Sequence, residues 1–153
     1  MIREPAIVFA LLTCWPGAGA GQERAPSECM DSAKTQAGIT ACSGDSYKAA
    51  DRKLQSLVAE LRDSMPAPQR AQLDSAQRAW RAYTAVQCRL EAASYAGGTI
   101  YATQVATCRR VLAERRIAEL APLLCRQGGQ PGQPCPAADR YRTPDRAASK
   151  RRH

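Results

Sequence analysis

The sequence predicts an all-α protein: a small antiparallel bundle of about three main helices, stapled by disulfides and followed by a disordered basic C-terminal tail. Three observations lead to this prediction. Apolar residues recur at helical spacing in three successive segments, Pro-rich or Gly-rich breaks separate those segments, and an even number of cysteines remains once an N-terminal leader is set aside. Because only 5% of the 153 residues are aromatic, the core must consist mainly of Leu, Val and Ala.

Residues 1–20 are typical of a secretory signal peptide. Arg3 precedes an apolar run, and small residues end the segment at Ala20, where we expect cleavage. The apolar run is shorter than the ~20 residues that a spanning helix needs, so we expect no transmembrane anchor. A lipoprotein anchored through Cys14 is less favoured, because Thr13 stands where such a signal carries a smaller residue. The sequence therefore predicts an exported protein, periplasmic or secreted.

The first main helix is predicted at residues 49–65. Its inner stripe consists of Leu54, Leu57, Val58 and Leu61. The prolines at 66 and 68 end this helix, because proline cannot continue a helix interior, and they can begin the next one.

Two further helices are predicted at about residues 68–94 and 100–124. Gly97 and Gly98 break the chain between them, and Thr99 is the expected N-cap of the later helix. The inner stripe of the earlier helix is Leu73, Ala76, Trp80, Tyr83 or Thr84, and Cys88. The inner stripe of the later helix is Tyr101, Val105, Cys108, Leu112 and Leu120, with Arg116 at its margin.

Six cysteines remain in the mature chain, and an oxidising compartment favours three disulfides among 15 possible connectivities. Cys88 and Cys108 each lie ten residues from Gly98, so an antiparallel hairpin brings them to the same height. A Cys29–Cys42 bridge requires the chain to reverse between them, at Gly38 or in residues 34–36. Cys125 and Cys135 flank a flexible Gly/Pro loop that permits their closure. These three pairings are the ones that geometry favours.

Charge divides the mature chain into two parts. The predicted helical domain, residues 23–125, has a net charge of +3, whereas the predicted loop and disordered tail, residues 126–153, has +5. We expect no nucleic-acid partner, because export separates the tail from nucleic acid. An anionic lipid or wall polymer is a suitable partner for the tail, and a solvated tail with no function is the alternative.

A set of residues in the second and third helices carries a family resemblance. The set consists of Leu73, Ala76, Gln77, Arg78, Trp80, Gly97, Gly98, Leu112, Arg116 and Leu120. With the cysteines at 88 and 108, it resembles the LprI-like lysozyme inhibitor family of bacterial envelope proteins, over about residues 29–120. The resemblance implies an exported, disulfide-bonded helical domain whose partner is a lysozyme or another envelope protein.

Several of these residues permit two interpretations. Trp80 is either a core anchor or a surface for stacking a ligand. Gln77 and Arg78 either tie neighbouring helices together or form a recognition patch. The paired glycines either serve the helix turn or present backbone donors to an anion. The arginine pairs at 109–110 and 115–116 form either a solvated face or an anion-binding face.

The composition argues against an enzyme. The single His is the last residue, His153, so neither a histidine triad nor a histidine metal site is expected, and we expect no cofactor. Two binding functions remain: lysozyme inhibition, suggested by the resemblance, and a non-inhibitory structural or interaction role in the envelope. A basic lysozyme would be repelled at long range, and only Asp74 and Glu91 are candidates for an acidic contact. The partner and the oligomeric state are left open.

Overall fold

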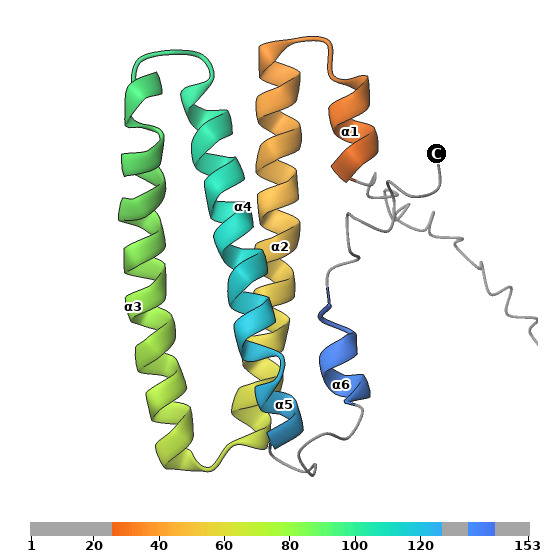
Figure 1. Ribbon diagram of the computed structural model, residues 1–153, viewed down its shortest axis with the longest axis vertical. Helices are drawn as coiled ribbons and strands as arrows, with labels where there is room; N and C mark the ends of the chain where they lie inside the picture. The colour runs from red at the N-terminus through yellow and green to blue at the C-terminus, as the bar shows by residue number, and fades with distance from the viewer. Residues whose placement is uncertain (1–25, 127–134, 143–153) are drawn as a thin grey trace, which may run out of the picture.

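Helices make up the regular structure of the residues that the computed structural model describes, which are 26–126 and 135–142 (Figure 1). The three long helices are α2 (Gln36–Ser64), α3 (Ala67–Glu91) and α4 (Tyr101–Leu120). The short elements are α1 (Pro26–Ser32), the 3₁₀ helix η1 (Ala93–Tyr95), α5 (Leu123–Arg126) and α6 (Pro136–Asp139). The predicted all-α class with three main helices is confirmed. None of the helices in these ranges has both the length and the apolar character needed to cross a membrane.

The three long helices run antiparallel, and α4 lies between α2 and α3 (Figure 1). Met65 and Pro66 join α2 to α3, both with extended backbone, and the N–H of Met65 donates to the carbonyl of Arg62. Pro68 lies in the first turn of α3, where its missing N–H costs no hydrogen bond. Because α4 occupies the middle, α3 forms one edge of the layer.

The core lies mainly between α2 and α4. Leu54, Leu57 and Leu61 of α2 are 1%, 0% and 0% exposed. They share one apolar cluster with Leu73 of α3, Ala113, Ile117 and Leu120 of α4, and Ala121. Burying one leucine stabilises the fold by about 1.5–3 kcal/mol, so these side chains dominate the packing of α2. Val58, the fourth residue of the predicted stripe, is half buried against the same cluster.

The helix α2 begins well before its predicted start at residue 49. Thr35 is the N-cap, and its hydroxyl oxygen accepts a hydrogen bond from the N–H of Gly38 at 3.1 Å. The buried residues in its first turns include the small polar Ser43 and Ser46. Large apolar residues at helical spacing, the pattern that predicts a helix, are therefore missing there. The chain reverses at residues 33–35, next to the predicted 34–36, whereas Gly38 lies inside the helix.

The buried side of α3 agrees with the predicted stripe at Leu73, Thr84 and Cys88 and differs from it at Ala76 and Trp80. It consists of Leu73, Gln77, Thr84 and Cys88. The sequence placed Ala76 and Trp80 on this side, but Ala76 is exposed and Trp80 is half buried. Gln77 is buried instead because α4 supplies a polar partner, the Nε of Arg116, which donates to its side-chain oxygen at 2.9 Å.

The helix α4 has two packed sides, where the sequence predicted one. The fully buried residues are Thr103, Ala113, Ile117 and Leu120. Of the predicted stripe, Leu120 is buried as expected, whereas Tyr101, Val105, Cys108, Leu112 and Arg116 are half buried. Two of its members, Cys108 and Arg116, contact α3. A helix between two neighbours buries residues on both flanks, so a single stripe describes only one of its contacts.

Three disulfides join neighbouring elements of the fold. They are Cys29–Cys42, Cys88–Cys108 and Cys125–Cys135, the pairings that the sequence favoured. Their Cα–Cα distances are 5.7, 5.5 and 5.8 Å, within the usual range for a disulfide. They fix α1 to α2, α3 to α4, and α5 to the residue before α6.

Part of the segment predicted as loop and disordered tail is ordered. Ala138 and Tyr141 pack against the core, and the hydroxyl of Tyr141 donates to Glu60 of α2 at 2.8 Å. Arg140 forms an ion pair with the same carboxylate. The partner for these residues lies about eighty positions away in the chain, so local composition did not reveal it. The rest of the predicted loop and tail, 127–134 and 143–153, lies outside the described residues, as do the signal peptide 1–20 and Cys14.

Candidate functional site

The family-motif residues serve mainly the contact between α3 and α4. Leu73, Gln77 and Leu120 are buried, Trp80, Leu112 and Arg116 are half buried, and Ala76, Arg78, Gly97 and Gly98 are exposed. The structure brings Gln77 and Arg116 together but leaves the two glycines at the far end of the hairpin. These residues therefore do not form one continuous surface.

The polar contact at the centre of the α3–α4 interface is structural. The guanidinium of Arg116 donates through Nε to the Gln77 oxygen at 2.9 Å and through Nη1 to Glu119 at 3.0 Å. Gln77 is 6% exposed, so it faces α4 and is withdrawn from solvent. The structure therefore supports the interpretation in which Gln77 connects neighbouring helices, whereas Arg78 is exposed on the surface.

Two other arginines of α4 are engaged with their own chain. Arg110 forms an ion pair with Glu114 at 2.6 Å, and the guanidinium of Arg109 lies over the ring of Tyr47 in α2, 5.9 Å from its centre. These contacts favour stabilising roles over an anion-binding face. Arg115 lines a surface hollow, described below.

The turn between α3 and α4, which we call the hairpin tip, comprises residues 92–100. Gly97 has φ of +77°, and a Cβ on Gly98 would lie 3.2 Å from the carbonyl oxygen of Tyr95. The carbonyl of Tyr95 accepts the N–H of Gly98 at 3.0 Å, which closes the turn. Both glycines are thus explained by turn geometry. Thr99 is not the N-cap: that position is Ile100, whose side chain makes no capping hydrogen bond.

The hairpin tip is exposed and uncharged. Every residue from 93 to 100 is exposed, including the large side chains of Tyr95 at 42% and Ile100 at 37%. No acidic or basic residue occurs between Glu91 and Arg109. An aromatic and an aliphatic side chain are therefore exposed at this end of the molecule without an accompanying charge.

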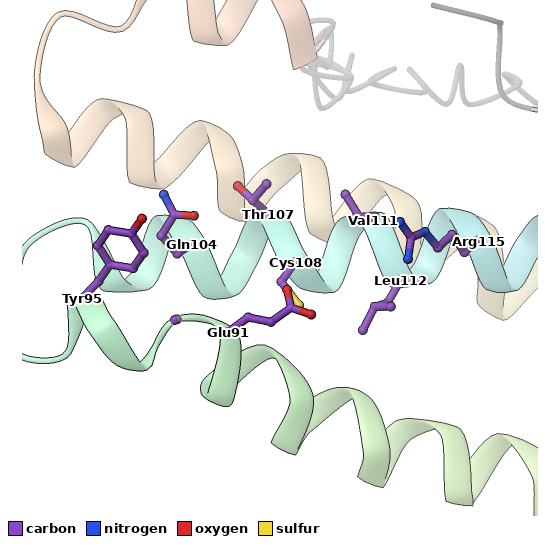
Figure 2. Close-up of a pocket in the computed structure, with 9 residues that line it drawn as sticks. Glu91, Tyr95, Gln104, Thr107, Cys108, Val111, Leu112 and Arg115 are labelled. Carbon is purple, nitrogen blue, oxygen red and sulfur yellow. The ribbon is translucent and has the colours of Figure 1, made fainter.

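A hollow of about 340 Å³ lies directly behind the tip, between the end of α3 and α4 (Figure 2). Tyr95 stands at the end next to the turn and Arg115 at the other end, while Glu91 extends from α3 along the hollow toward Cys108. Thr107 and Leu112 of α4 also line it. The tip and this hollow together form the candidate site, which combines an aromatic, an acid and a base.

The Cys88–Cys108 disulfide supports the base of the tip. Cys88 is 0% exposed and its carbonyl accepts the N–H of Ala92, the first residue of the tip, at 3.2 Å. Cys108 lines the hollow from the other helix. A covalent bond between the two helices restricts how far the tip can open or twist. The structure thus presents the tip as a preorganised projection.

The two acidic residues considered as contacts for a basic partner do not form a patch. Asp74 forms an ion pair with Arg62, near the opposite end of α3 from Glu91. Glu91 accepts a hydrogen bond from Gln87 at 2.9 Å. In the part of the chain that the structure describes, no three His, Cys, Asp or Glu side chains gather to hold a metal ion.

Tyr95 and the hollow are the features that sequence reasoning missed. Hydrophobic periodicity indicates buried residues, and residues 93–100 of the tip are all exposed. The signal was nevertheless in the sequence: an uncharged run over residues 92–108 contains an aromatic residue beside a glycine pair. In a chain that is 24% charged, such an uncharged run indicates a candidate contact surface.

The family model described as lysozyme inhibitor LprI matches residues 29–120. The matched range contains α2, α3 and α4, the hairpin tip and the hollow behind it, and two of the three disulfides. It ends before the Cys125–Cys135 disulfide and α6. No curated protein and no solved structure matches the chain.

Proposed function

The chain belongs to the LprI lysozyme inhibitor family, and from this premise we propose that it is an exported inhibitor of a lysozyme or related muramidase whose hairpin tip enters the enzyme's cleft. It acts by binding and performs no catalysis of its own. Residues 1–20 direct export and are then removed. Three disulfides are consistent with export, because such bonds persist in oxidising compartments.

The observation that carries this proposal is the exposed, uncharged tip held by a disulfide. A substrate cleft admits a narrow projection more readily than the flank of a long helix. Tyr95 supplies a rigid aromatic with a polar end, the kind of side chain that dominates protein interfaces. Because the tip is preorganised by Cys88–Cys108, little conformational entropy is lost when it binds.

Electrostatics determine how the encounter depends on salt. The helical domain carries +3 and the whole chain +8, so a basic lysozyme is repelled at long range. The tip itself brings no charge into the contact. Salt screens the long-range repulsion, so we expect the association rate with a basic lysozyme to rise as ionic strength increases.

Alanine substitution of Tyr95 tests the proposal. The mature protein, with its disulfides intact, is mixed with a basic animal lysozyme and the rate of cell-wall lysis is followed over a range of inhibitor concentrations. We expect Tyr95→Ala to weaken inhibition by about 2 kcal/mol, roughly a thirty-fold rise in the inhibition constant.

Tyr83→Ala is the matched control, because Tyr83 is 54% exposed on α3 but lies outside the tip. Inhibition unchanged by Tyr95→Ala, or reduced equally by Tyr83→Ala, would exclude the tip as the contact. Absence of inhibition by the native protein, even at high molar excess, would exclude the function itself.

We also propose a second role, in which the basic tail holds the protein to anionic lipid or wall polymer. The support is the composition of residues 143–153, which contain four basic residues against one acidic residue, whereas Arg140 and Arg142 of the described part pair with Glu60 and Asp139. Each basic residue near an anionic surface contributes about 1 kcal/mol at most. Removing residues 143–153 should abolish salt-sensitive sedimentation with anionic vesicles while leaving inhibition intact, and unchanged sedimentation would refute this role.

A further inference from the structure

One long side of α3 is apolar and exposed. The residues at 72, 76, 79, 83, 86 and 90 alternate at spacings of four and three, which places them in one stripe along the helix. They are Gln72, Ala76, Ala79, Tyr83, Val86 and Leu90, and all are exposed. The last three are 54%, 59% and 68% exposed, the largest fractions among the big hydrophobic residues described.

This stripe belongs to the helix at the edge of the layer and carries no charge. α3 is the outermost of the three long helices, with α4 on its other side (Figure 1). The charged residues of α3 between 72 and 90 are Asp74, Arg78, Arg81 and Arg89, and none belongs to the stripe. A contiguous apolar strip on a basic protein is the kind of surface that marks an interaction site.

A hollow of about 540 Å³ adjoins the N-terminal half of the stripe. It is lined by Gln72 and Ala76 of the stripe together with Met65, Leu73 and Leu123. The large side chains of the stripe occur only in its C-terminal half. One helix therefore carries a recess at one end of the stripe and large exposed side chains at the other. Ala76 at the recess and Leu90 at the other end are about 21 Å apart along the helix axis.

We propose that this face binds a second copy of the same chain, with the two α3 helices antiparallel. A two-fold axis at the level of residue 81 sets Tyr83 of each copy opposite Ala79 of the other. The same axis sets Val86 opposite Ala76, and Leu90 opposite Gln72. Each large side chain then meets a small or recessed position, and both recesses are filled at once, as an isologous interface requires.

Two further features favour this antiparallel pairing. In a parallel arrangement Tyr83 of one copy faces Tyr83 of the other, which crowds the contact at that level. The alanines also face each other, which leaves gaps. The antiparallel arrangement also sets the C-terminal end of α3, with Glu91, at the level of the recess of the partner copy, which Arg126 lines. Opposite charges at the rim of an apolar contact select the pairing direction.

The size of the contact predicts a weak dimer. The stripe is less than one helix long, so it buries less than the ~800 Å² per partner that is typical of stable interfaces. We expect the mature protein to be monomeric when dilute and to dimerise reversibly as its concentration rises.

Sedimentation equilibrium of the mature, oxidised protein over a wide concentration range tests the proposal. Ala79→Glu should raise the dissociation constant at least ten-fold, because it places two carboxylates in the apolar seam. Ala118→Glu, the same change at an exposed alanine of α4, should leave the dissociation constant unchanged. A monomer at every concentration, or equal weakening by both variants, would overturn the proposal.

A charge-pair rescue tests the direction of pairing. In the antiparallel arrangement, position 79 of one copy faces position 83 of the other. A mixture of Ala79→Glu and Tyr83→Lys should therefore form a heterodimer more tightly than either variant forms a homodimer. A mixture that associates no better than its components would refute the antiparallel register.

Discussion

Removing the Cys88–Cys108 disulfide should weaken inhibition. The loss should be larger than the lost stability of the fold alone would cause, because the bond also holds the hairpin tip in place. The change is the double substitution Cys88→Ala and Cys108→Ala. The bond closes a separation of 20 residues, so loss of the cross-link should lower the free energy of unfolding by about 3.3 kcal/mol in the chain-entropy model. A domain with a typical stability of ~5–15 kcal/mol tolerates this loss and remains folded.

The Cys125–Cys135 pair is a matched control. It closes a separation of 10 residues, for which the same model gives about 2.7 kcal/mol. It joins α5 to the residue before α6, at the opposite end of the molecule from the hairpin tip (Figure 1). The double alanine variant at this pair should therefore lose similar stability without disturbing the tip.

The two variants should differ in inhibition. Without Cys88–Cys108 the tip must be ordered again upon binding, and fixing even one backbone residue costs ~1–2 kcal/mol, so the inhibition constant should rise roughly ten-fold. Urea unfolding followed by circular dichroism measures the stability of each variant, and lysis of cell walls measures inhibition. Equal inhibition by both variants would refute the role assigned to a preorganised tip.

Four other substitutions test the fold. Leu57→Ala, at a side chain that is 0% exposed, should lower the free energy of unfolding by about 3 kcal/mol, measured by urea unfolding. Gly97→Ala should destabilise by about 1 kcal/mol because φ is +77° there, whereas Gly44→Ala, inside α2 with open space around its Cβ, should stabilise slightly. The pKa of Tyr141 lies above its ordinary value of 10.0 because of burial and then because of Glu60, so stability from this residue is present below about pH 10 and is lost as pH rises through the folded-state pKa. Glu60→Gln should lower that pKa, seen by ultraviolet titration of the phenol, and should make the alkaline loss of stability smaller; an unchanged titration would contradict the contact.

The hairpin and its disulfide were predictable because they depend on local spacing. The glycine pair fixes the turn, and equal distances from it align Cys88 with Cys108. The long early part of α2 was not predictable in the same way, since small polar residues such as Ser46 are buried there and leave no apolar period. α6 depends on Glu60, a contact across the chain that composition alone does not reveal.

The candidate site was harder to predict than the fold. Trp80 is the one tryptophan outside the predicted signal peptide, yet it is half buried beside the core. Gln77 was weighed as a recognition residue, but its partner Arg116 explains its burial. Tyr95 lies outside every apolar stripe, and only the arrangement of the helices shows that it projects beside a hollow.

Hydrogen–deuterium exchange of the mature protein, with and without a saturating lysozyme, tests the central claim most directly. The account predicts slower exchange of the backbone amides in the hairpin tip, residues 93–100, and at the adjoining start of α4 when the enzyme is present. Little change is expected in the amides of α6, which lies at the opposite end. Protection confined to α2 or α6, with the tip amides exchanging as in the free protein, would contradict the account.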